Sequence, residues 1–159
     1  IDNFEKIYEV KWLNMMRDKL GLFGEDTNDR ELINNLLSWM ENNKADYTNT
    51  FCYLMNIKID NNKIYKDENF INWSNKWQNR LTINNNSKEK SIDLMRISNP
   101  IVIPRNHKVE EALTMANKDN LKTLNRLLSV LKKPYEIQEN IKDYQLPMID
   151  EEYQTFCGT

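Results

Sequence analysis

The stretch Asn99-Pro100-Ile101-Val102-Ile103-Pro104-Arg105-Asn106-His107 separates one set of amphipathic helical patterns from another. It holds two of the chain's four prolines. Each proline removes a backbone donor and biases the residue before it away from the helical region, so an ordered turn or extended passage is expected. Its apolar centre predicts burial, and Arg105 and Asn106 are suited to hydrogen-bond nearby backbone groups. We therefore expect a joint against which the later helices pack.

Before this joint, apolar side chains recur every three or four residues, which predicts five amphipathic helices. The first should end at Gly21, because glycine readily adopts the left-handed conformation of a helix stop. Asp46 is suited to cap the third helix, and Ser87 or Lys88 should begin the fifth. The residues expected to be buried by the first four helices are Phe4, Tyr8, Trp12, Met15, Met16 and Leu20; Leu32, Ile33, Leu36, Leu37 and Met40; Tyr47, Phe51, Leu54 and Met55; and Phe70, Trp73, Trp77 and Leu81.

Two further helices are expected after the joint. Pro104 can take the first position of the sixth helix, where its missing donor costs nothing. The seventh helix, over about 121–132, repeats leucine at 121, 124, 128 and 131 in the pattern of a hairpin partner. From 135 to 159 the apolar residues follow no helical period. The sequence thus predicts an all-α protein of about seven helices in an irregular array, with a helical domain over 1–134 and a long extended C-terminal tail over 135–159, packed on the helices.

Composition restricts the class of protein. The 159 residues carry a net charge of -2, from 22 basic and 24 acidic side chains, so neither nucleic acid nor a membrane is expected as a partner. No apolar run approaches the length needed to span a bilayer, and Ile1-Asp2-Asn3 is not a signal peptide. The missing initiator Met suggests a piece of a longer polypeptide. Two cysteines form neither a disulfide framework nor a metal site, so a cytoplasmic location is expected.

Short motifs along nearly the whole chain resemble the selenoprotein O (SelO, YdiU-like) family, in the family's order. The motifs are Lys19-Leu20-Gly21-Leu22, Asp46-Tyr47-Thr48-Asn49-Thr50-Phe51, Trp73 to Trp77 with Arg80-Leu81, Asn99-Pro100, Arg105-Asn106, Ala112-Leu113, Asn125-Arg126-Leu127-Leu128, Pro134-Tyr135 and the terminal Cys157. The resemblance is to the C-terminal region of that family. The family usually has glycine at the position of Asp119, so Asp119 should be left-handed, with Asn120 capping the last helix.

The resemblance implies a specific activity for a larger protein. SelO proteins are similar to protein kinases but act as pseudokinases that bind ATP in a flipped orientation. They transfer AMP to Ser, Thr or Tyr hydroxyls of proteins, using Mg²⁺ or Mn²⁺. Their nucleotide and metal ligands lie upstream of the region matched here. This chain would therefore support and regulate the kinase-like lobe of the same polypeptide. The protein substrates would be modified by that lobe. Alone it should be inactive.

The residues themselves give no catalytic, cofactor or metal site. Three glycines cannot build a phosphate-binding loop, and neither His-Arg-Asp nor Asp-Phe-Gly occurs. His107 could be a base, but no local partner supports that role, and packing is favoured. Glu25-Asp26-Thr27-Asn28-Asp29 could hold a cation, although a helix-capping acidic loop is favoured because calcium-loop spacing is missing. Asp150-Glu151-Glu152 is interpreted as a solvated run.

Aromatic and sulfur side chains offer three more candidates. Trp73 and Trp77 could form a ligand platform, but their four-residue spacing favours the core. Cys52 stands where the family tends to have arginine and receives no family role. Cys157 lies in an aperiodic terminus, where a thiol is accessible. The resemblance places it in the family's terminal redox motif and implies a disulfide with a cysteine of the kinase-like part. No second cysteine lies nearby, so a local Cys-x-x-Cys reaction is excluded. Cys157 is therefore the expected regulatory residue.

Two kinds of function remain open from the sequence. One is an accessory helical part of an enzyme, and the other is a free-standing helical protein-interaction module without catalytic activity. A large exposed apolar face along the first helices would favour the accessory part, because a domain separated from its neighbour exposes the former interface. A closed polar surface with one groove would favour the module.

Overall fold

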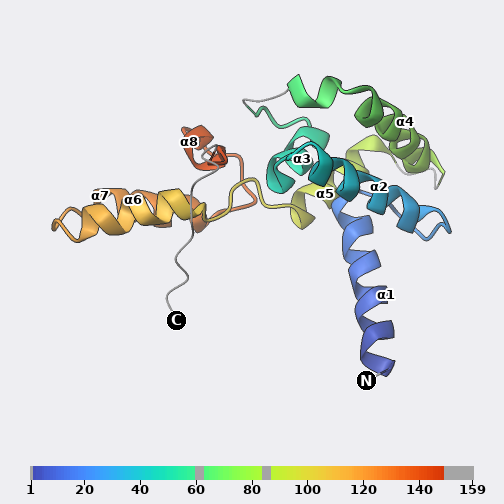
Figure 1. Ribbon diagram of the computed structural model, residues 1–159, viewed down its shortest axis with the longest axis horizontal. Helices are drawn as coiled ribbons and strands as arrows, with labels where there is room; N and C mark the ends of the chain where they lie inside the picture. The colour runs from blue at the N-terminus through green and yellow to red at the C-terminus, as the bar shows by residue number, and fades with distance from the viewer. Residues whose placement is uncertain (1, 60–62, 84–86, 149–159) are drawn as a thin grey trace. The chain divides into compact units, whose positions relative to one another are not determined.

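The computed structural model describes residues 2–59, 63–83 and 87–148, and within these ranges every regular element is helical. The all-α prediction is confirmed, with eight α-helices in this part of the chain in place of about seven. The added helix, α8, is one short turn inside the segment predicted to be extended. In order, the elements are α1 (Asp2–Lys19), α2 (Asp29–Asn42), α3 (Tyr47–Leu54), the 3-10 helix η1 (Lys63–Lys66), α4 (Glu68–Thr82), α5 (Lys88–Ser98), α6 (Asn106–Ala116), α7 (Lys122–Leu131) and α8 (Lys142–Gln145) (Figure 1).

The chain divides into two compact units, Ile1–Asn99 and Pro100–Thr159. The boundary falls inside the joint expected from the sequence. In the second unit the backbone amide of Ile101 donates to the carbonyl of Pro134 at 2.7 Å, and Gln145 Nε2 donates to the carbonyl of Ile101 at 3.2 Å. These bonds satisfy backbone groups of a buried, non-helical segment. The division proposed from sequence at residue 134 stays a prediction.

Helix ends follow local signals in the sequence. The side chains of Asp46, Asp67 and Ser87 each accept a hydrogen bond from a first-turn amide of α3, α4 and α5. Four helices stop at a left-handed residue, after which the next amide bonds a carbonyl five positions back, as in the Schellman motif. The four residues, with their φ angles, are Gly21 (68°), Lys44 (49°), Asn56 (59°) and Asp119 (57°). The expected conformations of Gly21 and Asp119 are therefore confirmed.

The core of the first unit is rich in aromatic rings. α2 packs on α4, and α1 packs on α2 and α5. Trp73 and Trp77 stack with centroids 5.9 Å apart. Their indole nitrogens donate to the carbonyls of Leu32, at 2.8 Å, and Leu20, at 2.9 Å. Both tryptophans are thus core residues with satisfied polar atoms, as the favoured interpretation of the sequence has it.

Several expected details are corrected by the structure. Phe4, Tyr8 and Met15 are exposed, although the periodicity of α1 predicted burial. In α7, Leu127 and Val130 are buried, whereas Leu121 and Leu128 are exposed, so a neighbouring face of the helix turns inward. Apolar residues cover more than one face of both helices, and tertiary contacts select the face that is buried.

The starts of the last two long helices also differ from expectation. α6 begins at Asn106 with Arg105 at its N-cap, so Pro104 precedes the helix. Leu121 holds the N-cap position of α7. The carboxamide of Asn120 still accepts a hydrogen bond from the amide of Lys122, at 3.2 Å, and so satisfies one first-turn donor.

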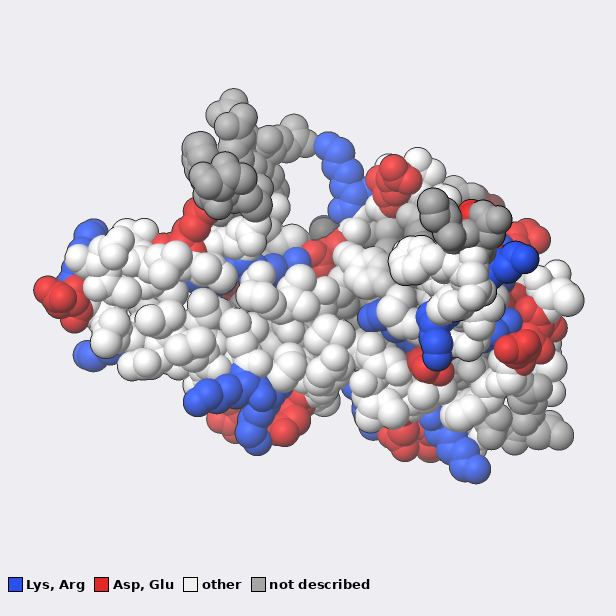
Figure 2. Space-filling view, turned by 90° about the horizontal axis from the view of Figure 1, so that it is seen from below, with Lys and Arg blue, Asp and Glu red and all other residues white. Residues whose placement is uncertain are grey.

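Charges of both signs are interspersed over the face drawn in Figure 2, in keeping with the net charge of -2. In the part of the chain that the structure describes, no helix combines the length and apolar character that crossing a membrane requires.

Candidate functional site

Large apolar side chains lie exposed along one side of α1. The exposed fractions are 74% for Phe4, 52% for Ile7, 59% for Tyr8 and 44% for Met15. Steps of three, one and seven residues along the chain place these four side chains in one line, which we call the α1 stripe. The buried Met16, and Leu20 directly after the helix, lie on another side, roughly 120–160° around the helix axis from Phe4 at about 100° per residue. α1 therefore has two apolar faces, and only one is covered.

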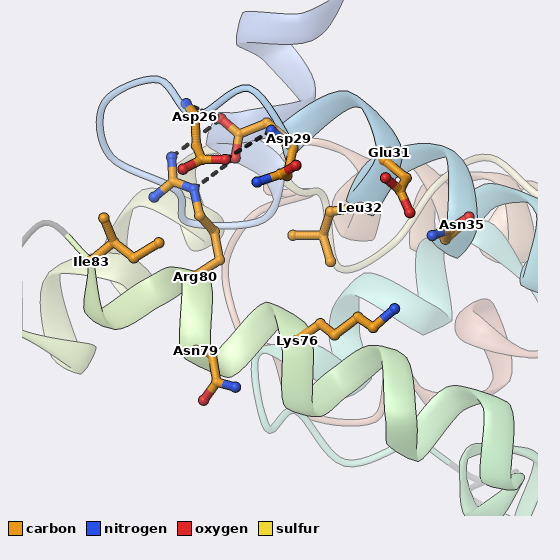
Figure 3. A pocket seen from close by; sticks show the side chains of 10 residues that line it. Asp26, Asp29, Glu31, Leu32, Asn35, Lys76, Asn79, Arg80 and Ile83 are labelled. Atoms are coloured by element: carbon orange, nitrogen blue, oxygen red, sulfur yellow. Dashed lines mark hydrogen bonds and ion pairs between the residues drawn. The ribbon is translucent and has the colours of Figure 1, made fainter.

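The last turn of α1 belongs to a buried charge cluster that joins three helices. Asp29, at the start of α2, is fully buried. Its Oδ2 accepts from Arg17 Nε of α1 and its Oδ1 from Arg80 Nε of α4, both at 2.7 Å. Arg80 Nη2 also reaches the carbonyls of Phe23 and Gly24, each at 3.3 Å. The cluster thus fixes the loop between α1 and α2 as well as the three helices. Figure 3 shows the part of the cluster formed by Asp29 and Arg80.

The environment of Asp29 keeps its carboxylate ionised. Burial raises the pKa of Asp29, but hydrogen bonds from Arg80, Arg17 and the amide of Asp26 outweigh burial and lower the pKa below its ordinary value of 3.8. Because both oxygens already accept hydrogen bonds, Asp29 is poorly placed to act as a base or to bind a cation. Asp26 Oδ1 accepts from the amide of Asn28 at 2.8 Å. The carboxylates of this acidic loop therefore organise the start of α2.

Beside the cluster, a cavity of about 460 Å³ opens between α2 and α4. Figure 3 shows Lys76, Asn79 and Arg80 on one wall, from α4, and Glu31 and Asn35 on the other, from α2. The cavity has room for a small polar molecule. Its buried acid is already neutralised by two arginines, and charges of both signs line it. Among the described residues, no group of His, Cys, Asp and Glu side chains is arranged to hold a metal ion.

A second polar connection ties α1 to the end of α5. Lys19 Nζ donates to Asn99 Oδ1 at 3.2 Å, and Asn99 Nδ2 donates back to the carbonyl of Lys19 at 2.9 Å. Burial lowers the pKa of Lys19. The ammonium also lies 5.5 Å from the ring centre of Tyr47 and 5.2 Å from that of Phe51, within cation–π range. The first residue of the joint is thus held inside the first unit.

The structure places the remaining sequence candidates separately. His107 lies in the first turn of α6, where burial and then Lys108 and Arg105 lower its pKa. In the described part of the chain no hydrogen bond joins it to a carboxylate. Cys52 is fully buried in α3. Cys157 and the run Asp150-Glu151-Glu152 lie outside the described residues.

Sequence reasoning missed the roles of Arg17 and Arg80. The sequence places Asp29 in an acidic loop that could cap a helix or hold a cation, and it places Arg80 only in a family motif. A signal was present, however. Arg80 follows Trp73 and Trp77 by seven and three residues and so continues the buried side of α4. A charged residue on an apolar face must be paired, which predicts a buried partner of opposite charge.

Comparison with known proteins identifies the relatives of this chain. A model of the family described as protein adenylyltransferase SelO matches residues 1–132. Proteins called protein nucleotidyltransferase YdiU from Pelagibacter ubique, Clostridium perfringens and Nitrosococcus oceani are 54%, 45% and 43% identical to it. Each match covers 100% of this chain and 33% of the relative. The chain thus spans about a third of the length of the curated relatives it matches.

The fold and the two features of α1 define an all-α helical protein that has a structural ion-pair cluster and an uncovered apolar helix face. Within that class, the match over residues 1–132 decides the family. The chain belongs to the SelO family, as its motifs indicate.

Proposed function

We propose that this chain is the helical C-terminal part of a protein adenylyltransferase that transfers AMP from ATP to Ser, Thr or Tyr hydroxyls of proteins. In this proposal the chain supports a kinase-like lobe of the same polypeptide, which would hold ATP and Mg²⁺ or Mn²⁺. The names of the relatives and the family description support a nucleotidyltransferase. The relatives' greater length leaves about two thirds of each relative for the nucleotide site.

The α1 stripe is the observation that carries the supporting role. A contiguous apolar patch on a soluble protein marks an interaction surface. Burying one large apolar side chain stabilises by about 1.5–3 kcal/mol, so covering Phe4, Ile7 and Tyr8 favours association strongly. Charges of both signs follow the stripe along α1, including Glu9, which pairs with Arg30 of α2 at 3.6 Å. An apolar centre with a polar rim is the usual anatomy of an interface.

The α1 stripe also discriminates between the two functions left open by the sequence. A free-standing interaction module needs a surface that is polar except at its binding groove. The accessory part of an enzyme exposes the face that its neighbour would cover. The stripe therefore favours the accessory part.

Substitution of the stripe tests this role. In the full encoded polypeptide, Phe4→Ser with Tyr8→Ser should lower both the melting temperature and AMP transfer from labelled ATP. In the isolated chain the same pair should leave the melting temperature unchanged. Ile71→Ser with Ile97→Ser, at exposed positions of α4 and α5, is the matched control and should have little effect in either context. Equal effects of the two pairs in the full polypeptide would contradict the proposal.

Nucleotide binding gives a second test. Titration of the isolated chain with ATP and magnesium should show no appreciable binding, because the ligands for both are proposed to lie elsewhere in the polypeptide. Micromolar binding, or AMP transfer by the isolated chain, would mean that this part holds an active site of its own.

The proposal includes redox regulation through Cys157. Oxidation would join its thiol to a cysteine of the kinase-like part in a disulfide. A long separation along the chain is no obstacle, because the entropy cost of closing a loop grows slowly with loop length. Cys52 is a poor partner because it is buried in α3. In the oxidised full polypeptide, peptide mapping without reductant should find Cys157 in a disulfide. If Cys157→Ser leaves the response of AMP transfer to reductant intact, the regulatory role fails.

A further inference from the structure

Two adjoining recesses form a groove between the end of α3, the second half of α4 and the start of α5. Their volumes are about 250 Å³ and 380 Å³. They share four lining residues, so they are parts of one depression, which we call the α3–α5 groove. The shared residues are Leu54, Asn56, Trp77 and Gln78.

The smaller recess offers an apolar seat for one large side chain. Leu81 of α4 and Ile92 of α5 line it and are half-buried, so part of each side chain faces the recess. The floor includes Trp77, whose ring is held in place because its Nε1 donates to the carbonyl of Leu20 at 2.9 Å. A rigid apolar recess of this kind accepts an aromatic or large aliphatic anchor with little reorganisation.

The rim of the groove is polar and basic. The exposed carboxamides of Asn56 and Gln78 lie on the shared wall, and each can donate and accept hydrogen bonds as a peptide backbone requires. Lys58 lines the larger recess and Lys88 the smaller one. Both lysines are exposed, and neither forms an ion pair within the described residues. None of the described lining residues is acidic, although acidic residues outnumber basic ones in the chain as a whole.

We propose that the α3–α5 groove binds an acidic segment of a protein, with one aromatic or large aliphatic side chain in the recess beside Trp77 and carboxylates near Lys58 and Lys88. Charge complementarity selects an acidic partner, because two cations face the groove and no described lining side chain opposes them. The cavity beside Asp29 differs in this respect, since Asp26, Asp29 and Glu31 line it. The proposal goes beyond the proposed AMP transfer and depends on neither ATP nor the α1 stripe.

Labelled peptides test the proposal on the isolated chain. Fluorescein-labelled Glu-Glu-Phe-Glu-Glu should bind at low salt with a dissociation constant on the order of 100 µM, as one anchor and two exposed ion pairs allow. Lys-Lys-Phe-Lys-Lys and Glu-Glu-Ala-Glu-Glu should each bind about tenfold more weakly by fluorescence anisotropy. In two-dimensional NMR spectra, the indole signal of Trp77 and the side-chain signals of Asn56 and Gln78 should shift, whereas that of Asn35 should not.

Charge reversal identifies the site. Lys58→Glu with Lys88→Glu should weaken binding of the acidic peptide about tenfold. Both residues are exposed, and a glutamate at the first position of α5 suits the helix dipole, so folding should be retained. Lys66→Glu with Lys90→Glu, at exposed positions that do not line the groove, is the matched control and should change binding less than twofold.

Three results would overturn the proposal, and none depends on a variant folding. They are equal binding of the acidic and basic peptides, no binding of the acidic peptide up to about 2 mM, and tighter binding of a short single-stranded oligonucleotide than of the acidic peptide. Equal binding by the two double variants would place the peptide elsewhere and would also reject the groove. All these outcomes leave the α1 stripe and AMP transfer untouched.

Discussion

The two ends of α1 have the same helical spacing of apolar residues but opposite environments. At the C-terminal end, Met16 and Leu20 are buried, and Arg17 is paired with Asp29. At the N-terminal end, Phe4, Ile7 and Tyr8 are exposed. The apolar spacing of a helix thus predicts that a face is suited to burial, but not whether this chain supplies the cover. The covered end should determine the stability of the chain, and the uncovered end its associations.

The largest effect is expected from the charge cluster at the covered end. Asp29→Ala leaves the buried Arg80 without a carboxylate and leaves Arg17 with only the exposed Glu25, at 3.3 Å. It should lower the free energy of unfolding by about 3–5 kcal/mol in urea titrations. Asp93→Ala removes an exposed pair with Arg96 and should cost below about 1 kcal/mol. Similar losses for the two variants would show that water replaces the carboxylate of Asp29 without penalty.

Matched truncations compare the two ends of α1 directly. Leu20→Ala removes a fully buried side chain and should cost about 2–5 kcal/mol, from lost burial and the cavity left behind. Ile7→Ala lies in the α1 stripe and should change the stability of the isolated chain by no more than about 0.5 kcal/mol. Thermal and urea unfolding measure both. A large loss at Ile7 would mean that the isolated chain buries the stripe in solution.

The stop of α1 gives a smaller but more specific effect. Gly21→Ala should cost about 2–3 kcal/mol, because Gly21 has a φ of 68° and an added Cβ would lie 2.6 Å from the backbone oxygen of Ser91 on α5. Gly24→Ala is the control, since Gly24 is exposed and has a φ of 67°. It should cost about 1–2 kcal/mol, because a side chain at Gly24 meets only the penalty of the left-handed backbone conformation. Equal losses of stability in the two variants would show that α5 moves away from α1 at little cost, so that the contact with Ser91 adds no penalty.

The smallest effect is a dependence on pH. The pKa of Asp29 is lower in the folded chain than the ordinary value of 3.8, so its contribution is complete above that value. The contribution is lost as the pH falls through the lower, folded pKa, because the unfolded chain then binds the proton first. Urea titrations below pH 4 should show a steeper loss of stability in the parent chain than in Asp29→Ala. Parallel curves would contradict the assignment of this acid sensitivity to Asp29.

The sequence by itself determined the features that depend on local chemistry. An aspartate or serine before a helix satisfies first-turn amides, and a glycine tolerates the left-handed stop, so the roles of Asp46, Ser87 and Gly21 could be predicted. The spacing of Trp73 and Trp77 likewise indicated a core position. The family also followed from motifs that are read in order along the chain.

Only the tertiary structure decided which apolar face is covered and which charges meet. Arg17 lies 12 residues from Asp29, and Arg80 lies 51 residues away, so no local rule joins them. The α1 stripe has the same periodicity as a buried face, and only the positions of α2 and α5 show that it is exposed. The physical reason is that caps and helix stops are settled within one turn, whereas burial and ion pairing depend on distant segments of the chain.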